Sequence, residues 1–180
     1  MNFNESMGIH RQGNDVQNKN NKKKFMILRV GEDHYGIFLH QVREVIATNQ
    51  MTILPSMPDF FAGVINLRGK IIPTVYLNKS LRTHEDKPDK LVVRKPCIVI
   101  TEFEGTFFGA LVDDVSEVVT VNLDQVDNSM NQDIEYHDLF LGVIKIEKKK
   151  PIPILNLEKS LRIDELRKKQ NFENIDQENK

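Results

Sequence analysis

The chain has 180 residues and a mass of 20.9 kDa, with 25 Lys and Arg against 26 Asp and Glu, one Cys and 39% hydrophobic residues. Its apolar runs are shorter than the roughly 18 residues that a membrane-spanning helix needs, and a single Cys excludes a disulfide scaffold. Its 16 Val and 17 Ile outnumber its 3 Ala, and branched side chains favour strands over helices. We therefore predict a mainly β core.

The two ends of the chain are poorer in apolar residues than the middle. Residues 1–23 show no periodicity and predict a disordered, basic and Asn-rich tail, whereas residues 167–180 predict a polar C-terminal extension. The residues after Met1 lack the apolar stretch of a signal peptide. The single Cys97 lies in an apolar, strand-like segment, which predicts a buried free thiol of the kind found in a reducing compartment. We therefore expect a cytoplasmic protein that does not insert into a membrane.

The first half of the middle region alternates strand patterns with turns. Val42, Val45 and Ile46 stand at i, i+3 and i+4, which indicates a short amphipathic helical turn. Pro73 falls inside a strand pattern and predicts an edge or a bulge, because proline cannot donate to a β-ladder. In chain order, the predicted elements are strands at 25–30 and 34–39 around a turn at 31–33, the helical turn at 42–46, strands at 62–67 and 70–77, and a helix start at 78–82.

The second half repeats this order of elements. Pro153 again falls inside a strand pattern, and Lys148-Lys149-Lys150 predicts a solvated turn rather than a nucleic-acid patch. The predicted elements are strands at 97–103 and 106–112 around a turn at 104–105, a helical turn at 115–119, strands at 139–146 and 151–157, and a closing helix from 158 to about 169.

The two halves are also similar in sequence. Three blocks recur in the same order, which indicates a duplicated unit of roughly 75 residues. Short strands, tight turns and that unit length favour two small β-barrels, at about 24–85 and 92–166, joined by the polar segment 83–96. Exchange of strands between the barrels stays open. The matching blocks are 35–46 with 108–119, 63–65 with 142–144, and 72–82 with 152–162.

Residue types that serve catalysis or bind metals are scattered along the chain. The five His do not cluster, and segment 63–70 lacks the Gly spacing and the Ser or Thr of a phosphate-binding loop. Asp113-Asp114 follows a predicted strand, where neighbouring carboxylates more often cap a helix than act as an acid and base pair. We expect no enzyme activity and no bound cofactor or metal.

One turn differs between the two halves. Asn66-Leu67-Arg68-Gly69-Lys70 ends a strand with Gly where the chain must reverse, and it projects Arg68 beside an apolar surface. The aligned segment 145–149 has no Arg-Gly, so the duplication alone does not explain it. Arg68 is either an ordinary exposed turn residue or a binding residue.

Three motifs together carry a resemblance to a known family. They are Val42-x-Glu44-Val45-Ile46, the run Gly-Val-Ile-Asn-Leu-Arg-Gly at 63–69 after Leu54-Pro55, and Gly109-x-x-Val112-Asp113-x-Val115-x-Glu117-Val118. Over about residues 24–165 the chain resembles the CheW family of bacterial chemotaxis coupling proteins. The resemblance implies two five-stranded, SH3-like β-barrels with short helices and a C-terminal helix. It also implies a non-catalytic adaptor that links the tips of transmembrane chemoreceptors to the CheW-like regulatory domain of the histidine kinase CheA.

The resemblance also implies where partners bind. Receptor tips would lie in a groove between the barrels, and the double barrel would pair pseudo-symmetrically with CheA or with other CheW copies in rings. Tyr76 and Asn156 depart from the family, whose members commonly have Asp at these positions, so loop geometry and selectivity near them stay open. The implied receptor or kinase contacts are Val42, Glu44, Val45, Gly63, Asn66 and Arg68.

Two other classes of protein remain as alternatives. One alternative is a double barrel that binds nucleic acid or serves as another interaction module. Binding of nucleic acid would need a basic face with aromatic side chains, whereas the chain outside residues 1–24 is acidic and its aromatic content is 7%. A signalling enzyme would need a convergent polar pocket, which no motif indicates. We therefore expect no nucleic-acid partner.

Overall fold

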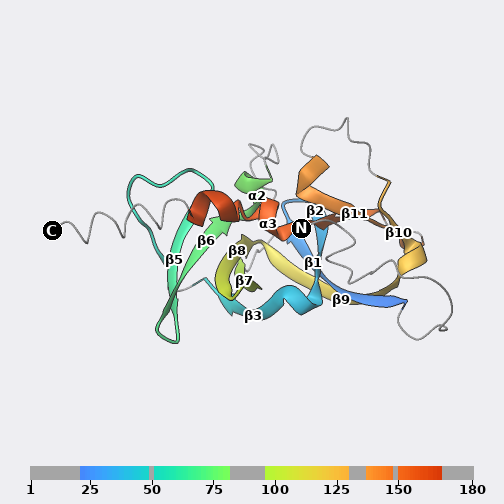
Figure 1. Ribbon diagram of the computed structural model, residues 1–180, viewed down its shortest axis with the longest axis horizontal. Helices are drawn as coiled ribbons and strands as arrows, with labels where there is room; N and C mark the ends of the chain where they lie inside the picture. Colours follow the sequence, from blue (N-terminus) through green and yellow to red (C-terminus); the bar gives the residue numbers. More distant parts are fainter. Residues whose placement is uncertain (1–20, 49–50, 82–95, 130–136, 148–149, 168–180) are drawn as a thin grey trace.

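The computed structural model describes residues 21–48, 51–81, 96–129, 137–147 and 150–167. Two curled β-sheets lie side by side, and the short helices α2 (Leu77–Ser80) and α3 (Leu157–Ser160) lie at their junction (Figure 1). The mainly β prediction is confirmed. In the part of the chain described, no helix is both long and apolar enough to cross a bilayer. The calls on residues 1–20, 82–95, 148–149 and 168–180 lie outside these ranges.

Within the described ranges, each sheet has six strands, in an order that does not follow the chain. Sheet I runs in the order β10-β11-β12-β2-β1-β9, and sheet II runs in the order β3-β7-β8-β6-β5-β4. The strands of sheet I are β1 (Lys22–Val30), β2 (Asp33–Phe38), β9 (Asp114–Asn122), β10 (Val126–Asp127), β11 (Phe140–Ile144) and β12 (Ile152–Leu155). The strands of sheet II are β3 (Val42–Ala47), β4 (Met51–Thr52), β5 (Phe61–Leu67), β6 (Lys70–Tyr76), β7 (Cys97–Phe103) and β8 (Thr106–Val112). The 3-10 helices are η1 (Leu39–Gln41), η2 (Leu123–Gln125) and η3 (His137–Leu139).

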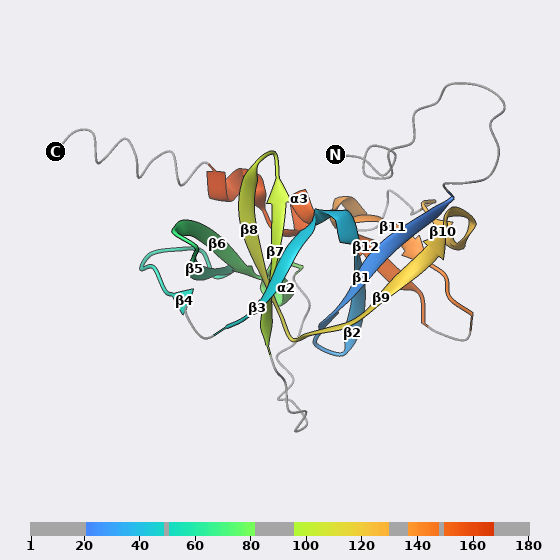
Figure 2. The ribbon, with the colours of Figure 1, turned by 90° about the horizontal axis from the view of Figure 1, so that it is seen from below.

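Both sheets combine strands from the two sequence repeats. The hairpin β1–β2 of the first repeat pairs with β9 and β12, and the hairpin β7–β8 of the second repeat pairs with β3 and β6. The chain passes from sheet I to sheet II between β2 and β3, and it returns between β8 and β9 (Figure 2). The ranges 24–85 and 92–166 therefore do not coincide with the sheets, because long-range strand pairing decides which sheet each local hairpin joins.

The edge strands of each sheet are neighbours along the chain. β9 and β10 form the edges of sheet I and are joined by η2, while β3 and β4 form the edges of sheet II. If each such pair is counted as one edge, each sheet has five strands among the described residues, as the family resemblance implies. Among the described residues, the two edges of a sheet are not paired with each other, so the SH3-like barrels are open rather than closed.

Both predicted helical turns are wrong. Residues 42–47 form β3 and residues 114–122 form β9, and these strands pair with β7 and β1. The helix-like spacing has a different cause, because burial alternates along β3: Val42 and Ile46 pack against the core, whereas the apolar Val45 lies on the exposed face. Lys22 and Lys23, which the sequence assigned to the N-terminal tail, instead belong to β1 and pair with the end of β9.

The two strand prolines lie where a ladder ends. Pro73 and Pro153 belong to strands with a neighbour on each side, but the parallel pairing of those strands begins one residue later, at Thr74 and Ile154. On the antiparallel side, a bulge adjoins the residue that faces each proline. The missing N–H therefore falls at a local edge, as the sequence predicts.

A shared apolar core joins the two sheets. Its largest cluster includes Leu28 of sheet I, Phe108 of sheet II and Leu161 after α3, all of them buried. At the junction of the short helices, the hydroxyl of Ser80 donates to the carbonyl of Ser160, which is the equivalent residue of the other repeat. Burial of these side chains holds the two sheets as one unit and so positions the exposed strand edges and turns described next.

Candidate interaction surface

The turn between β5 and β6 is a two-residue hairpin. Leu67 pairs with Lys70, and the intervening Arg68 and Gly69 have φ of 54° and 83°, as a type I′ turn requires. The side-chain oxygen of Asn66 accepts a hydrogen bond of 2.9 Å from the N–H of Gly69, which closes the turn. A left-handed backbone is uncommon for Arg, so Arg68 is held at the tip by the turn rather than by its own preference.

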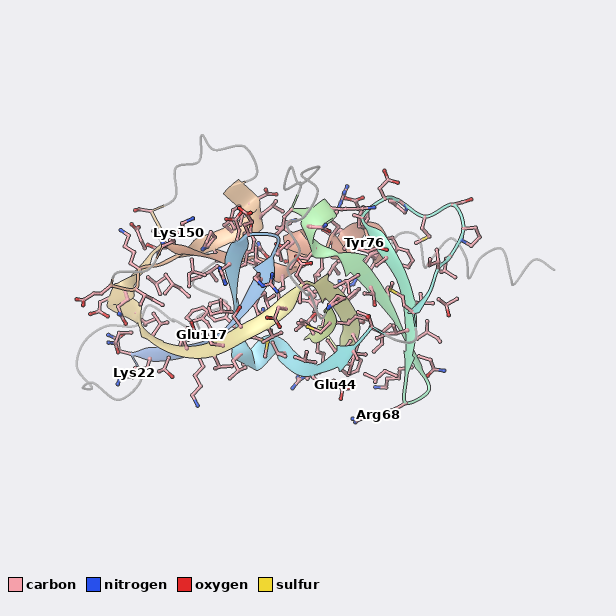
Figure 3. The ribbon with its side chains drawn as sticks, turned by 180° about the vertical axis from the view of Figure 1, so that it is seen from behind. Lys22, Glu44, Arg68, Tyr76, Glu117 and Lys150 are labelled. Carbon is pink, nitrogen blue, oxygen red and sulfur yellow. The ribbon has the colours of Figure 1, made fainter. Side chains whose placement is uncertain are left out.

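The structure brings Arg68 to Glu44. Arg68 Nη2 donates to Glu44 Oε2 at 3.0 Å, although the two residues are 24 positions apart. The Arg68 side chain remains 82% exposed, and that of Glu44 is 29% exposed. The pair ties the hairpin tip to β3 and leaves most of the guanidinium accessible to a partner (Figure 3).

The other predicted contact residues fall into two groups. Val45 is 41% exposed on β3 and Asn66 is exposed on β5, so both are accessible. Val42 is half-buried and packs against the large core cluster. Gly63 is buried with φ of 148°, and a Cβ there would come within 2.5 Å of the Thr52 carbonyl oxygen.

These positions define what we call the Glu44–Arg68 surface, which consists of Glu44, Val45, Asn66 and Arg68. The four residues lie on a strand edge and near a hairpin tip, and none of the six predicted residues lines the clefts around His34, Ile163 or Gln41. Sequence reasoning missed Ile71, which is 63% exposed directly opposite Asn66. No alternation in the sequence indicated it, because Lys70 and Ile71 are both exposed and the four residues from Ile72 to Val75 are all buried.

Further charges adjoin this surface on β3. Arg43 Nε donates to Glu102 Oε2 of β7 at 2.6 Å, with the Arg43 side chain 54% exposed. Partial burial, together with the positive charges of Lys23 and Arg43, lowers the pKa of His40 below its usual value. Among the described residues, no group of three or more His, Cys, Asp or Glu is arranged to hold a metal ion.

The two positions that depart from the family pattern are equivalent in the fold. Tyr76 precedes α2 and Asn156 precedes α3, and neither side chain makes a capping hydrogen bond to its helix. Asn156 is buried, and the Lys79 ammonium lies 4.8 Å from the Tyr76 ring centroid. Both departures therefore lie at helix starts and outside the Glu44–Arg68 surface.

Comparison with known proteins decides the family. A model described as a CheW-like domain matches residues 24–165. The chain belongs to this CheW-like family. This confirms the predicted family.

Individual CheW proteins are similar over most of that region. The chain is 31% identical over 104 residues to the chemotaxis protein CheW of Klebsiella aerogenes, covering 58% of this chain and 60% of that protein. It is 27% identical over 129 residues to the probable chemotaxis protein CheW of Rhizobium etli, covering 71% of this chain and 80% of the relative. The crystal structure of the scaffolding protein TtCheW from Thermoanaerobacter tengcongensis matches with a TM-score of 0.65 at 30% identity, covering 75% of this chain and 89% of that chain.

Proposed function

We propose that this CheW-like chain is a non-catalytic adaptor that couples chemoreceptors to the histidine kinase CheA in the cytoplasm, at membrane-bound receptor arrays. The observation that carries the proposal is the Glu44–Arg68 pair, displayed at an exposed turn of a fold that matches the CheW-like model over residues 24–165. The second repeat has no Arg-Gly turn, so the pair is a specialisation of the first repeat.

Receptor binding would use the Glu44–Arg68 surface. A helical receptor tip needs apolar anchors together with charges that fix its orientation. Val45 supplies an exposed apolar side chain, while Glu44 and Arg68 supply charges of both signs within 3.0 Å of each other. Val42 and Gly63 would support this surface from beneath, because both are partly or fully buried.

Kinase binding would use the similarity of the two sheets. Each sheet contains an equivalent hairpin, edge strand and short helix, so one sheet of this chain can pair with the opposite sheet of a related double barrel. Head-to-tail contacts of this kind close into rings when the rotation allows it, and either CheA or further copies of this chain could be members. Each joint would be weak, so the assembly would depend on many joints acting together.

The experiment compares Arg68→Ala with Lys145→Ala in receptor-dependent kinase activation. Both changes remove an exposed cation from an ion pair, since Lys145 Nζ lies 2.6 Å from Asp127 Oδ2 in sheet I. We expect the free energy of unfolding of both variants to lie within about 0.5 kcal/mol of wild type, because exposed ion pairs contribute little to stability. Only Arg68→Ala should lose activation, since truncating a charge that binds a partner costs about 2 kcal/mol or more.

The proposal fails if Arg68→Ala activates the kinase as well as Lys145→Ala does. A pull-down with CheA and receptors from the same cell provides the direct test of partners. Affinity for duplex DNA at physiological salt, without affinity for the kinase, would instead favour the double-barrel nucleic-acid module.

A further inference from the structure

One edge of sheet I is open at strand β9. Among the described residues, β9 pairs with β1 on one side and with no strand on the other. Its pairing is regular from Glu117 to Asn122, because the register shift lies between Val115 and Glu117. Lys22, which pairs with the end of this regular stretch, lies at the opposite end of the molecule from Arg68 (Figure 3). The open edge is therefore separate from the Glu44–Arg68 surface.

The backbone of β9 directs the hydrogen-bonding groups of two residues outward. The N–H of Leu123 donates to the carbonyl of Asn21 at 2.9 Å, which fixes the phase of the β1–β9 ladder. In an antiparallel ladder, residues that exchange hydrogen bonds alternate with residues whose N–H and C=O point the other way. Val118 and Thr120 are of the second kind, so their N–H and C=O groups point away from β1.

The helix η2 closes this edge at the end of β9. The N–H of Asn122 also points away from β1, but it donates to the side-chain oxygen of Gln125 at 3.0 Å. The outward backbone groups that an added strand can use are therefore those of Val118 and Thr120.

One face of the open edge carries lysines. Side chains of directly paired residues lie on the same face of a sheet, and Lys24 pairs with Thr120. Lys22 pairs with Asn122 and lies on the same face, two residues along β1. Lys22, Lys24 and Thr120 are exposed, and Val118 is 50% exposed. A strand added beside β9 would therefore place alternate side chains next to Val118 and, across the small Thr120, toward the two lysines.

The equivalent edge of sheet II differs in both respects. There Ala47 of β3 faces Cys97 of β7, at the positions aligned with Thr120 and Lys24. Within the described ranges the β3–β7 pairing ends at that pair, whereas the β9–β1 pairing continues for two more residues. The lysine-bearing extension of the ladder is therefore a property of sheet I.

We propose that the open edge of β9 binds an extended, acidic peptide segment of another protein, which joins sheet I as a further strand. Hydrogen bonds to the backbone of Val118 and Thr120 would hold the segment, and acidic side chains at alternate positions would face Lys24 and Lys22. A second copy of this chain is a poorer fit, because antiparallel pairing of two β9 strands would gather the lysines of both copies on one face. This inference goes beyond the proposed adaptor function and does not depend on the Glu44–Arg68 surface.

The test uses a peptide with blocked ends and the sequence Ser-Glu-Val-Glu-Val-Val-Ser. Aligned antiparallel to β9, it sets its two Glu opposite Asn122 and Thr120 and a Val opposite Val118. The peptide is titrated into the uniformly 15N-labelled full chain, and amide hydrogen exchange is measured by NMR. At saturation we expect exchange at Val118 and Thr120 to slow by about tenfold or more, because both amides gain a partner, whereas Val119, whose N–H points to β1, should not change.

Two control peptides separate strand addition from attraction of charge. The order Ser-Glu-Glu-Val-Val-Val-Ser keeps the composition but puts the two Glu on opposite faces, so it should bind about threefold more weakly. A parent peptide that is N-methylated at the Glu opposite Thr120 cannot donate to that carbonyl and should not bind detectably. Binding of the N-methylated peptide as tightly as the parent would overturn the proposal.

Variants of the chain test the same contacts from the other side. Lys24→Gln should weaken peptide binding by about threefold, whereas Lys70→Gln, which changes an exposed lysine of sheet II, should leave it unchanged. Thr120→Pro should abolish binding, because it replaces an outward N–H with a ring at the edge. If Thr120→Pro disturbs the fold, the N-methylated peptide decides the point. Equal weakening by Lys70→Gln and Lys24→Gln refutes a site at β9.

Other occupants of this edge would give different results. Binding of a short DNA duplex, or of vesicles of phosphatidylserine and phosphatidylcholine, that depends on Lys22 and Lys24 while the peptide leaves the Thr120 amide unchanged would overturn the proposal in favour of a polyanion surface. Exchange at Val118 and Thr120 that slows with rising concentration of this chain alone would overturn it in favour of a second copy.

Discussion

Gly63→Ala is expected to destabilise the fold strongly, even though the sequence resemblance places Gly63 among contact residues. The added Cβ would lie 2.5 Å from the Thr52 carbonyl oxygen and 2.8 Å from Met51 Cγ. Thr52 cannot retreat without disrupting β4, which pairs with β5 at Thr52–Val64 and Met51–Ile65. Gly63 also has φ of 148°, which an L side chain rarely adopts.

The steric overlap and the backbone strain together set the expected loss of stability of Gly63→Ala. Overpacking in a core typically costs about 1–3 kcal/mol, and a strained backbone position costs about 1–3 kcal/mol more. For a domain of this size a loss of 1 kcal/mol lowers the melting temperature by about 2–4 °C. We therefore expect Gly63→Ala to melt roughly 5–15 °C below wild type by circular dichroism or calorimetry.

Gly69→Ala is the matched control. Gly69 also has positive φ, at 83°, but a Cβ there would meet nothing within 4 Å. Its substitution should therefore cost only about 1 kcal/mol, from backbone strain alone. The reasoning is refuted if Gly63→Ala melts at or above the temperature of Gly69→Ala. If instead Gly63→Ala melts like wild type but loses receptor-dependent activation, Gly63 is itself a contact residue.

Three further outcomes follow from local charges. A double-mutant cycle with Ala should give a coupling free energy between Glu44 and Arg68 of about 0.2–1 kcal/mol, which should fall as the salt concentration rises. A coupling free energy that does not depend on salt would contradict the interpretation that the ion pair is exposed to solvent. Burial and the carboxylates of Asp114 and Asp113 raise the pKa of the Cys97 thiol, so its alkylation by iodoacetamide should have a midpoint at higher pH than that of free cysteine, and Asp114→Asn should lower that midpoint. Hydrogen bonds from Lys145 and Ser129 lower the pKa of Asp127 in the folded protein. The Asp127 carboxylate therefore stabilises the fold above its unfolded pKa, and this stabilisation is lost as the pH falls toward its folded pKa. Asp127→Asn should reduce the loss of stability between neutral and acid pH, and an unchanged pH profile would contradict this.

Much of the local structure could be predicted from the sequence because it depends on neighbouring residues. The hairpins at 25–39, 97–112 and 61–76 follow from alternating branched residues around short turns, and the structure contains all three. The duplication was visible because both repeats keep equivalent glycines, Gly63 and Gly142, where a Cβ would meet the facing backbone. The position of Arg68 at a turn could likewise be predicted, because Arg68-Gly69 stands between two strand patterns, where Gly allows the chain to reverse.

Long-range contacts decided what local patterns could not. The spacing of Val42, Val45 and Ile46 suits a helical turn as well as a bulged strand, and only the available edge of β7 makes it a strand. Nothing local assigns β1–β2 to a sheet with β9 and β12, since that choice is made by pairing across more than 80 residues. The contact between Arg68 and Glu44 also depends on long-range pairing, because β3 and the β5–β6 hairpin belong to one sheet only through the hairpin β7–β8 that lies between them. The hairpins, the repeat and the exposed turn are therefore specified by residues that are close along the chain. Which strand edges meet is specified only in the folded molecule, because strand pairing depends on the free energy of the whole core rather than on any one segment.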